Sequence, residues 1–263
     1  MAKEATIYLD QQGKIAIVRL NDPVTLNALS ETMIETLQDV LDRVEASSRA
    51  MILTGTGKAF CSGANLNGGF PNRKADPAML DCGVALETHV NPLVARLREF
   101  KIPWISAVRG VAAGGGASLA LAGDMVIAAD NASFIQAFAR IGLVPDGGAL
   151  HMLTRTVGRV RANELALLGG QLSAEEACSL GLINRVVPDD ILDKAALELA
   201  GRLAEGAASL SVIRKLTWDA LDQGWQDMLR AERVAQRDAG RTQDFQEGVA
   251  AFREKRPAKF SGA

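Results

Sequence analysis

The sequence contains few histidines and cysteines, the residues that bind zinc and form a cysteine–histidine nucleophile. It has two histidines, His89 and His151, and three widely spaced cysteines, Cys61, Cys82 and Cys178, whose spacing matches no metal-binding motif. A zinc site is therefore not expected, and Cys61 is interpreted as small buried filler in preference to a nucleophile. The odd number of cysteines favours reduced thiols and a cytoplasmic location.

The sequence also has no large excess of charge of either sign. The 29 Lys and Arg residues nearly balance the 31 Asp and Glu residues, for a formal net charge of −2, so no nucleic-acid partner is expected. The N-terminal residues contain no apolar core of a secretory signal, and none is predicted. The uncharged run over residues 111–123 is too short and too rich in glycine to span a membrane.

Three familiar glycine and serine motifs are absent. The stretch Gly55–Phe60 lacks the spacing and the Ser/Thr of a phosphate-binding P-loop. The sequence GGGASLA at 114–120 lacks the acid that completes a dinucleotide-binding fingerprint. Ser118 is followed by Leu-Ala instead of x-Gly, so no nucleophile elbow is predicted, and Ser62 and Ser118 are interpreted as polar filler.

What is present is an alternation of strands and helices. Apolar alternation predicts a hairpin over residues 6–20 with a Gln-Gln-Gly turn, and helical spacing predicts a helix after an N-cap at Ser30. Short apolar runs predict buried strands at 50–57, 103–110, 124–130 and 182–188. Between the first two of these strands, a helical pattern predicts a helix at 89–101. This order predicts an α/β chain with crossover connections.

From about Pro188 the pattern becomes entirely helical. Turn signals separate four predicted helices, at 189–206, 209–224, 225–240 and 242–255. We therefore expect two units, a core of residues 1–190 and a C-terminal helical region of residues 191–263.

Two glycine-rich turns stand out, in CSGAN (61–65) and AAGGGAS (112–118). Glycine leaves peptide N–H groups uncovered, especially where a strand turns into a helix N-terminus. One N–H from each turn could bind a single oxygen and stabilise charge growing on it. Close packing of a helix against a strand also favours glycine, so both interpretations remain open here.

Four stretches in this order resemble the crotonase, or enoyl-CoA hydratase/isomerase, superfamily. They are RLNDPVTLNALSETM, LTGTGKAFCSGANL, ISAVRGVAAGGGASLALAGDMVIAAD, and the block that begins FARIGLVPDGGALHMLTRTVG. The resemblance covers nearly the whole chain and implies an α/β fold, a spiral of ββα turns with a C-terminal helical trimerisation region. It also implies an acyl-CoA thioester as partner, a homotrimer or a dimer of trimers, and no separate cofactor, because coenzyme A is part of the substrate.

The same resemblance implies where the substrate binds. The thioester oxygen would lie between the amides of Ala64 and Gly115. Thr25, Leu26 and the turn that includes Asn65 and Leu66 would lie along the CoA moiety. Asn65 stands where relatives carry aspartate, a departure that leaves the backbone donor in place.

The acids indicate which reaction to expect. The two glutamates that hydratases use to add water correspond here to Ser118 and Phe138, neither of which is a carboxylate. Asp146, in GLVPDGG, matches the aspartate of isomerase-type members. From the residues alone, Asp146 is either part of an ordinary Pro-Asp-Gly turn or the cap of a helix that begins near Gly148.

The resemblance thus implies an acyl-CoA isomerase in which Asp146 is the single acid/base and Phe138 lines an apolar acyl pocket. Partial desolvation of Asp146 should raise its pKa. The nearest branch acts on 1,2-epoxyphenylacetyl-CoA in phenylacetate breakdown, and related members isomerise 3-enoyl-CoA esters of fatty acid metabolism. The alternatives are an enoyl-CoA hydratase with atypical residues, and a non-catalytic member that binds a CoA ester or RNA. The segment 67–83 is expected to influence which acyl group fits.

Overall fold

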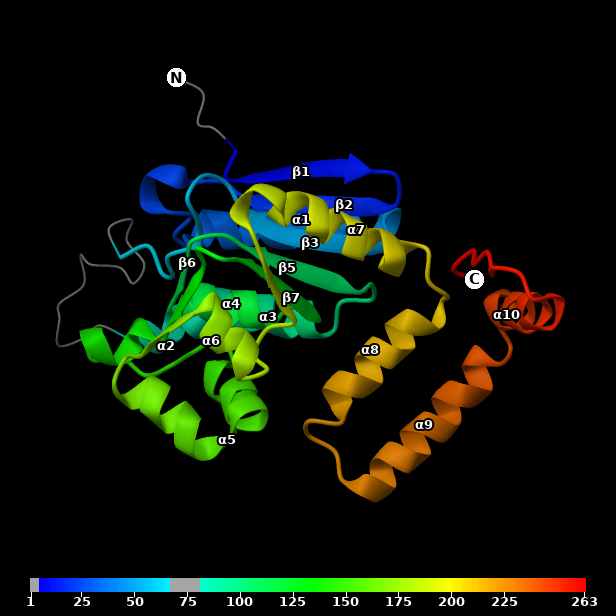
Figure 1. Ribbon diagram of the computed structural model, residues 1–263. Coiled ribbons are helices and arrows are strands. Elements are labelled where there is room, and N and C mark those ends of the chain that lie inside the picture. The colour runs from blue at the N-terminus through cyan, green and yellow to red at the C-terminus, as the bar shows by residue number, and fades with distance from the viewer. Residues whose placement is uncertain (1–4, 67–80) are drawn as a thin grey trace.

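A twisted, mostly parallel sheet forms the centre of the molecule (Figure 1). The computed structural model describes residues 5–66 and 81–263. Within these residues the larger sheet has six strands, in the spatial order β1 (Ile7–Gln12), β2 (Ile15–Leu20), β3 (Ala50–Gly55), β5 (Trp104–Val108), β7 (Met125–Ala129) and β10 (Arg185–Val187). The first pair is antiparallel and the following neighbours are parallel.

A second sheet of short strands lies beside the first. Among the described residues it has four strands, in the order β4 (Ala59–Cys61), β6 (Val111–Ala113), β8 (Ser133–Ile135) and β9 (Gln171–Ser173). Along the chain, β3, β5 and β7 of the larger sheet are each followed by a strand of the smaller sheet and then by a helix or short helical turns. This repetition is the ββα spiral that the family resemblance implied.

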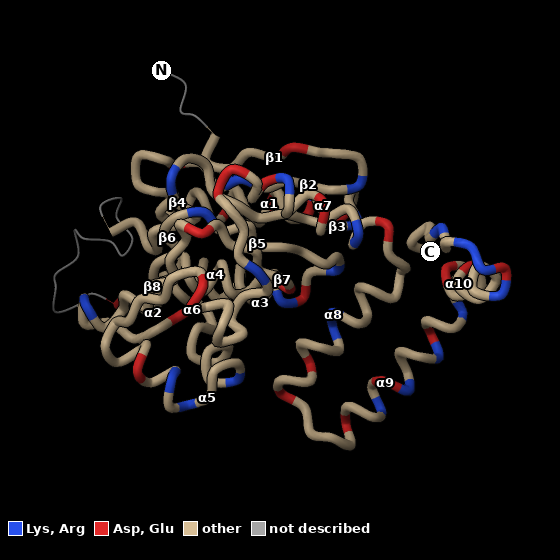
Figure 2. Tube along the Cα trace, viewed as in Figure 1, with Lys and Arg blue, Asp and Glu red and all other residues tan. Residues whose placement is uncertain are grey.

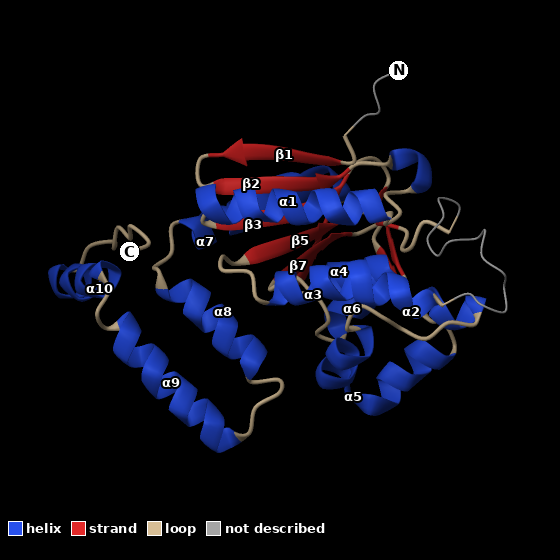
Figure 3. Cartoon of the chain, turned by 180° about the vertical axis from the view of Figure 1, so that it is seen from behind, coloured by secondary structure: helices blue, strands red, loops and turns tan. Residues whose placement is uncertain are grey.

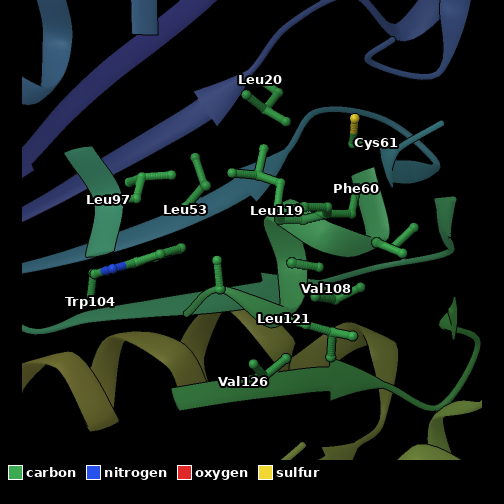
Figure 4. Close-up of a cluster of buried hydrophobic side chains, with 14 of the residues drawn as sticks. Leu20, Leu53, Phe60, Cys61, Leu97, Trp104, Val108, Leu119, Leu121 and Val126 are labelled. Carbon is green, nitrogen blue, oxygen red and sulfur yellow. The ribbon is translucent and has the colours of Figure 1, made fainter. Parts of the chain in front are cut away.

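Helices cover both faces of the larger sheet because successive side chains of a strand point to opposite sides. On one face, Ile15 and Ile17 belong to the same buried cluster as Leu192 and Leu199 of α7 (Leu192–Ala204). The other face is covered by α1 (Glu31–Ser47), α3 (Asn91–Arg98) and α4 (Gly115–Leu121), as Figure 3 shows. In that second core, Leu119 and Leu121 of α4 are buried with Phe60 and Val108 (Figure 4).

Several short helical elements and one longer helix complete the core. The short elements are η1 (Pro23–Thr25), α2 (Cys82–Ala85), the π-helical turn η3 (Leu86–Val90), η4 (Ala137–Ile141), α6 (Ala174–Ser179) and η5 (Asp189–Ile191). Helix α5 (Ala149–Leu167) is interrupted at Gly158, where φ is 75°. Because residues 67–80 lie outside the described residues, most of the segment expected to influence acyl specificity does too.

The last three helices extend away from the sheets (Figure 1). They are α8 (Ser209–Asp219), α9 (Trp225–Ala239) and α10 (Gln243–Glu254). Arg214 anchors α8 to the core: its Nε donates to Asp124 Oδ2 at 2.6 Å and one of its Nη atoms donates to the Phe100 carbonyl at 2.6 Å. Trp218 Nε1 donates to the same carboxylate at 3.0 Å. The buried guanidinium therefore pairs with a carboxylate and also satisfies backbone carbonyls in the last residues of α3 and just beyond it.

The main sequence predictions agree with this structure. The hairpin is confirmed, although its two-residue turn is Gly13–Lys14 and the glutamines before it continue β1, because Gly13 supplies the positive φ of 59°. The Ser30 cap is confirmed by its side chain, which accepts from Met33 N. In the part of the chain described, no helix has the length and apolar character needed to cross a bilayer.

Candidate active site

The two glycine-rich turns predicted from the sequence lie against each other. A methyl group on Gly116 would overlap the carbonyl group of Cys61, with its carbon only 2.8 Å from the carbonyl carbon. A methyl group on Gly63 would lie 2.7 Å from the Ala113 carbonyl oxygen and 3.6 Å from the amide nitrogen of Gly115. Close packing therefore does require glycine here, and it brings the backbone of both turns to one place.

The amide of Ala64 points away from its neighbouring chain. Leu29 N donates to the Gly63 carbonyl at 2.7 Å, and Asn65 N donates to the Leu29 carbonyl at 2.9 Å. In such a parallel bridge the middle residue, here Ala64, directs its own N–H and C=O to the opposite side. Among the described residues no backbone acceptor is found for this amide.

The amide of Gly115 is uncovered for a different reason. Gly115 is the first residue of α4, and the first N–H groups of a helix have no partner within it. Gly114, with φ 53° and ψ −127°, makes the sharp turn from β6 into the helix. Within the described residues Gly115 N has no backbone acceptor either. Both N–H groups expected to bind the thioester oxygen are thus available to a ligand.

Asp146 lies beside this pair of turns. A methyl group on Gly115 would be 3.6 Å from Asp146 Oδ1. The carboxylate does not cap α5: the N-cap is Gly148, no side chain bonds to the first turn, and Ala149 N donates to the main-chain carbonyl of Asp146 at 3.1 Å. The capping interpretation is therefore wrong. Burial raises the pKa of Asp146 to about 6, as the sequence predicted in direction.

Ser118 and Phe138, which the family resemblance places at the positions of the hydratase glutamates, lie next to Asp146 and Gly114 respectively. Ser118, only 1% exposed, donates through Oγ to the main-chain carbonyl of Asp146 at 2.9 Å. The ring of buried Phe138 would touch a methyl group on Gly114 at 3.8 Å. One position is thus a neutral hydrogen-bond donor and the other an apolar wall. The bond from Ser118 was missed by the interpretation of this residue as polar filler.

The residues expected to lie along CoA also come together. Ser62 N donates to the Leu26 carbonyl at 3.0 Å, and Ser62 Oγ donates to the Thr25 carbonyl at 2.8 Å. These bonds hold the turn that contains Thr25 and Leu26 next to the turn that carries Asn65 and Leu66. Leu26 is 40% exposed and has φ 58°, so an apolar side chain projects from this surface.

Asn27 supports this turn and was not singled out from the sequence. It is fully buried, adopts φ 58°, and donates through Nδ2 to the carbonyls of Thr56 (2.9 Å) and Ala59 (2.8 Å). Its Oδ1 accepts from Asp22 N at 2.9 Å. An asparagine after a Pro-containing turn was the available signal, because asparagine tolerates positive φ better than most residues.

The other groups considered as nucleophiles or metal ligands are not arranged for those roles. Burial raises the pKa of the Cys61 thiol to about 12, so it stays protonated at neutral pH. His151 Nε2 faces Asp222 at 3.6 Å. In the residues that the structure describes, no cluster of three His, Cys, Asp or Glu side chains could hold a metal ion.

Comparison with known proteins identifies the family. Residues 10–263 match the family model of enoyl-CoA hydratase/isomerase, and the chain belongs to this family. The chain is 44% identical over 253 residues to 1,2-epoxyphenylacetyl-CoA isomerase of Escherichia coli, covering 94% of this chain and 95% of the relative. It is 39% identical to a probable enoyl-CoA hydratase of Rhodobacter capsulatus, covering 98% of each.

Solved structures agree with the fold. An enoyl-CoA hydratase from Polaromonas superimposes with a TM-score of 0.90 at 33% identity, over 97% of this chain and 99% of that one. The molecule therefore has the α/β crotonase fold with C-terminal helices, as expected from the sequence. The family implies an acyl-CoA substrate.

Proposed function

We propose that this protein is a cytoplasmic acyl-CoA isomerase in which Asp146 is the single acid/base. The observation that carries the proposal is the half-buried carboxyl of Asp146 beside Gly115, at the edge of two turns with uncovered amides. Ala64 N–H and Gly115 N–H bind the thioester carbonyl oxygen. Because these donors are fixed by the backbone, they stabilise negative charge on that oxygen without reorganising.

The reaction moves one proton and one double bond. With a 3-enoyl-CoA, the Asp146 carboxylate removes a proton from C2, and the electrons of that C–H bond delocalise toward the thioester oxygen. The protonated Asp146 then returns the proton to C4, so the double bond shifts from C3–C4 to C2–C3. Substrate and product are isomers, and no water or second acid enters the step.

The environment of Asp146 suits both halves of this cycle. A general base works best when its pKa lies near the working pH, and burial raises the pKa of Asp146 to about 6. Phe138 lines the acyl pocket and excludes bulk water, which keeps the proton on the carboxyl between the two transfers. Hydration by two glutamates is disfavoured because Ser118 and Phe138 occupy their positions.

The substrate binds with its CoA moiety along Thr25, Leu26, Asn65 and Leu66. Two acyl classes fit a single carboxylate with an oxyanion hole: a 3-enoyl-CoA, and 1,2-epoxyphenylacetyl-CoA, which the Escherichia coli relative is named for. Coenzyme A is part of the substrate, and the proposal needs no further cofactor. The second class would place the protein in phenylacetate catabolism.

A substrate panel tests this proposal. The purified protein is assayed with a 3-enoyl-CoA, with 1,2-epoxyphenylacetyl-CoA and with crotonyl-CoA. Turnover of either of the first two esters, with little hydration of crotonyl-CoA, is the expected result. If hydration of crotonyl-CoA is the fastest reaction, the result would instead support an enoyl-CoA hydratase, the activity in the name of the Rhodobacter capsulatus relative. Binding of the esters without turnover would support a non-catalytic CoA-ester-binding protein.

We also propose that the C-terminal helices form a homotrimer or a dimer of trimers. An open groove of about 1080 Å³ lies between α8, α9 and α10, and its apolar lining includes Phe245 and Phe252. Phe252 is 85% exposed in the single chain, which is costly for so large an apolar side chain. Charges of both signs are interspersed along α9 and α10 (Figure 2), a distribution that does not favour RNA binding. Light scattering after size-exclusion chromatography gives the mass; a monomer at micromolar concentration contradicts the assembly.

A further inference from the structure

One side chain connects the two halves of the proposed site. Ser118 belongs to α4, the helix that begins at the proposed oxyanion donor Gly115. Its hydroxyl lies 2.9 Å from the main-chain carbonyl of Asp146, to which it donates, and 3.4 Å from the carbonyl of Gly114. Ser118 is thus in contact both with the turn that carries the amide and with the loop that carries the acid.

The carbonyl that Ser118 contacts is a fixed point of the acid loop. It accepts two hydrogen bonds, from Ser118 Oγ and from Ala149 N at 3.1 Å. A carbonyl oxygen has two lone pairs, so both are used. Because this carbonyl belongs to Asp146 itself, the bond from Ser118 acts directly on the backbone that holds the carboxyl.

The space around Ser118 is closed by the same loop. A methyl group on Gly147 would lie 3.1 Å from Ser118 Cβ and 3.5 Å from its Oγ. Gly147 has φ 59°, which disfavours any other residue, so the loop approaches α4 with bare backbone. A longer side chain at position 118 that keeps this direction would press against the backbone of Gly147.

We propose that Ser118 is a positioning residue that sets the place of Asp146 relative to Gly115, and that a glutamate at 118 excludes this placement. The inference rests on the proposed function of Asp146. A carboxylate at 118 has no proton to donate, so it would face the Asp146 carbonyl as one acceptor against another. It would also bury a negative charge at position 118, which is costly because Ser118 is only 1% exposed and its hydroxyl is neutral.

This placement gives a physical reason for serine, and not glutamate, at position 118 of this chain. The serine hydroxyl donates to the Asp146 carbonyl, which an ionised glutamate at 118 cannot do. The residue at 118 therefore affects isomerisation by setting where the Asp146 carboxyl lies.

Steady-state kinetics of Ser118→Ala test the inference. The variant removes one oxygen atom, and Ser106→Ala is the matched control, because Ser106 is a fully buried serine whose hydroxyl makes no hydrogen bond among the described residues. We expect Ser118→Ala to lower kcat by about 10²-fold, the effect of a displacement on the order of 1 Å, with KM for the CoA ester within about twofold. Ser106→Ala should keep the kcat of the wild type. An unchanged kcat for Ser118→Ala overturns the inference.

Ser118→Glu gives the second arm. Circular dichroism first checks that it folds; if it does not, Ser118→Ala alone decides. A folded Ser118→Glu variant should lose isomerisation and gain no hydration of crotonyl-CoA, whereas wild-type isomerisation would refute the exclusion. Asp146→Asn separates the two proposals: full activity of that variant refutes the proposed function, while its inactivity together with a normal Ser118→Ala refutes only the role of Ser118.

Discussion

Replacing Asp146 by asparagine should make the protein more stable at neutral pH while it removes the proposed catalytic group. The carboxyl is half-buried, and burial is the cause that raises its pKa from 3.8 to about 6. A folded chain at pH 8 therefore holds an ionised group where the neutral form is preferred. Asparagine has nearly the same shape and no charge, so the substitution removes this unfavourable term.

The magnitude follows from the pKa values. Each pKa unit corresponds to about 1.4 kcal/mol, so a pKa raised from 3.8 to about 6 corresponds to about 3 kcal/mol at pH 8. Solvent reaches part of the side chain, which reduces the expected gain to about 1–2 kcal/mol. In the wild type, protonated Asp146 contributes its full stability to the folded state below about pH 4. This contribution is lost as the pH rises through about 6. At pH 5 the gain should be about half its value at pH 8.

Urea unfolding at pH 5 and pH 8 measures this difference, with wild type and variant at equal protein concentration because assembly affects apparent stability. Asp39→Asn, on the exposed face of α1, is the control and should change the free energy of unfolding by less than about 0.5 kcal/mol at either pH. A variant that is less stable than wild type at pH 8, or an advantage that is equal at both pH values, would refute the reasoning.

Three further substitutions test how the site is built. Gly116→Ala should prevent correct folding or lower the unfolding free energy by about 3 kcal/mol or more, because the methyl group meets the Cys61 carbonyl; soluble yield and melting temperature report it. Arg214→Ala should cost about 3–5 kcal/mol in urea unfolding, because it leaves the Asp124 carboxylate without its charged partner. Asn27→Ala should cost about 3 kcal/mol and raise KM for the CoA ester, since the turn beside the CoA site loses three hydrogen bonds.

Their controls lie on the same kinds of element. Arg161→Ala, which breaks an exposed ion pair with Glu164, should cost less than about 0.5 kcal/mol, in contrast to Arg214→Ala. Gly201→Ala, within α7 and with open space around it, should be tolerated where Gly116→Ala is not. Equal losses within either pair would mean that the close contacts described above do not determine stability.

The longer elements could be predicted from the sequence because their patterns are long enough to be distinctive. Residues 31–47 show helical spacing over several turns with a serine cap, and each hairpin strand spans six residues on either side of a glycine-containing turn. The smaller sheet was harder, since each of its strands spans only three residues. So short a run carries too few side chains to show a period.

The residues of the proposed site could be named from the sequence, but their contacts could not. Glycines in two turns indicated uncovered amides, and GLVPDGG contained the acid that we propose to carry the proton. Serine at 118 has no local pattern that reveals its bond, because its acceptor, the carbonyl of Asp146, lies 28 residues away in the chain. Asn27 likewise bonds to carbonyls about 30 residues away, and only the fold brings these groups together.

The central claim, that Asp146 carries the proton, is tested most directly by the isomerisation rate of Asp146→Asn at saturating 3-enoyl-CoA or 1,2-epoxyphenylacetyl-CoA, whichever the wild type turns over. Binding of the same ester is measured in parallel by calorimetry. The account predicts that turnover falls by about 10²–10⁴-fold while the dissociation constant changes little, because the oxyanion donors and the CoA surface are intact. Turnover near that of the wild type would contradict it.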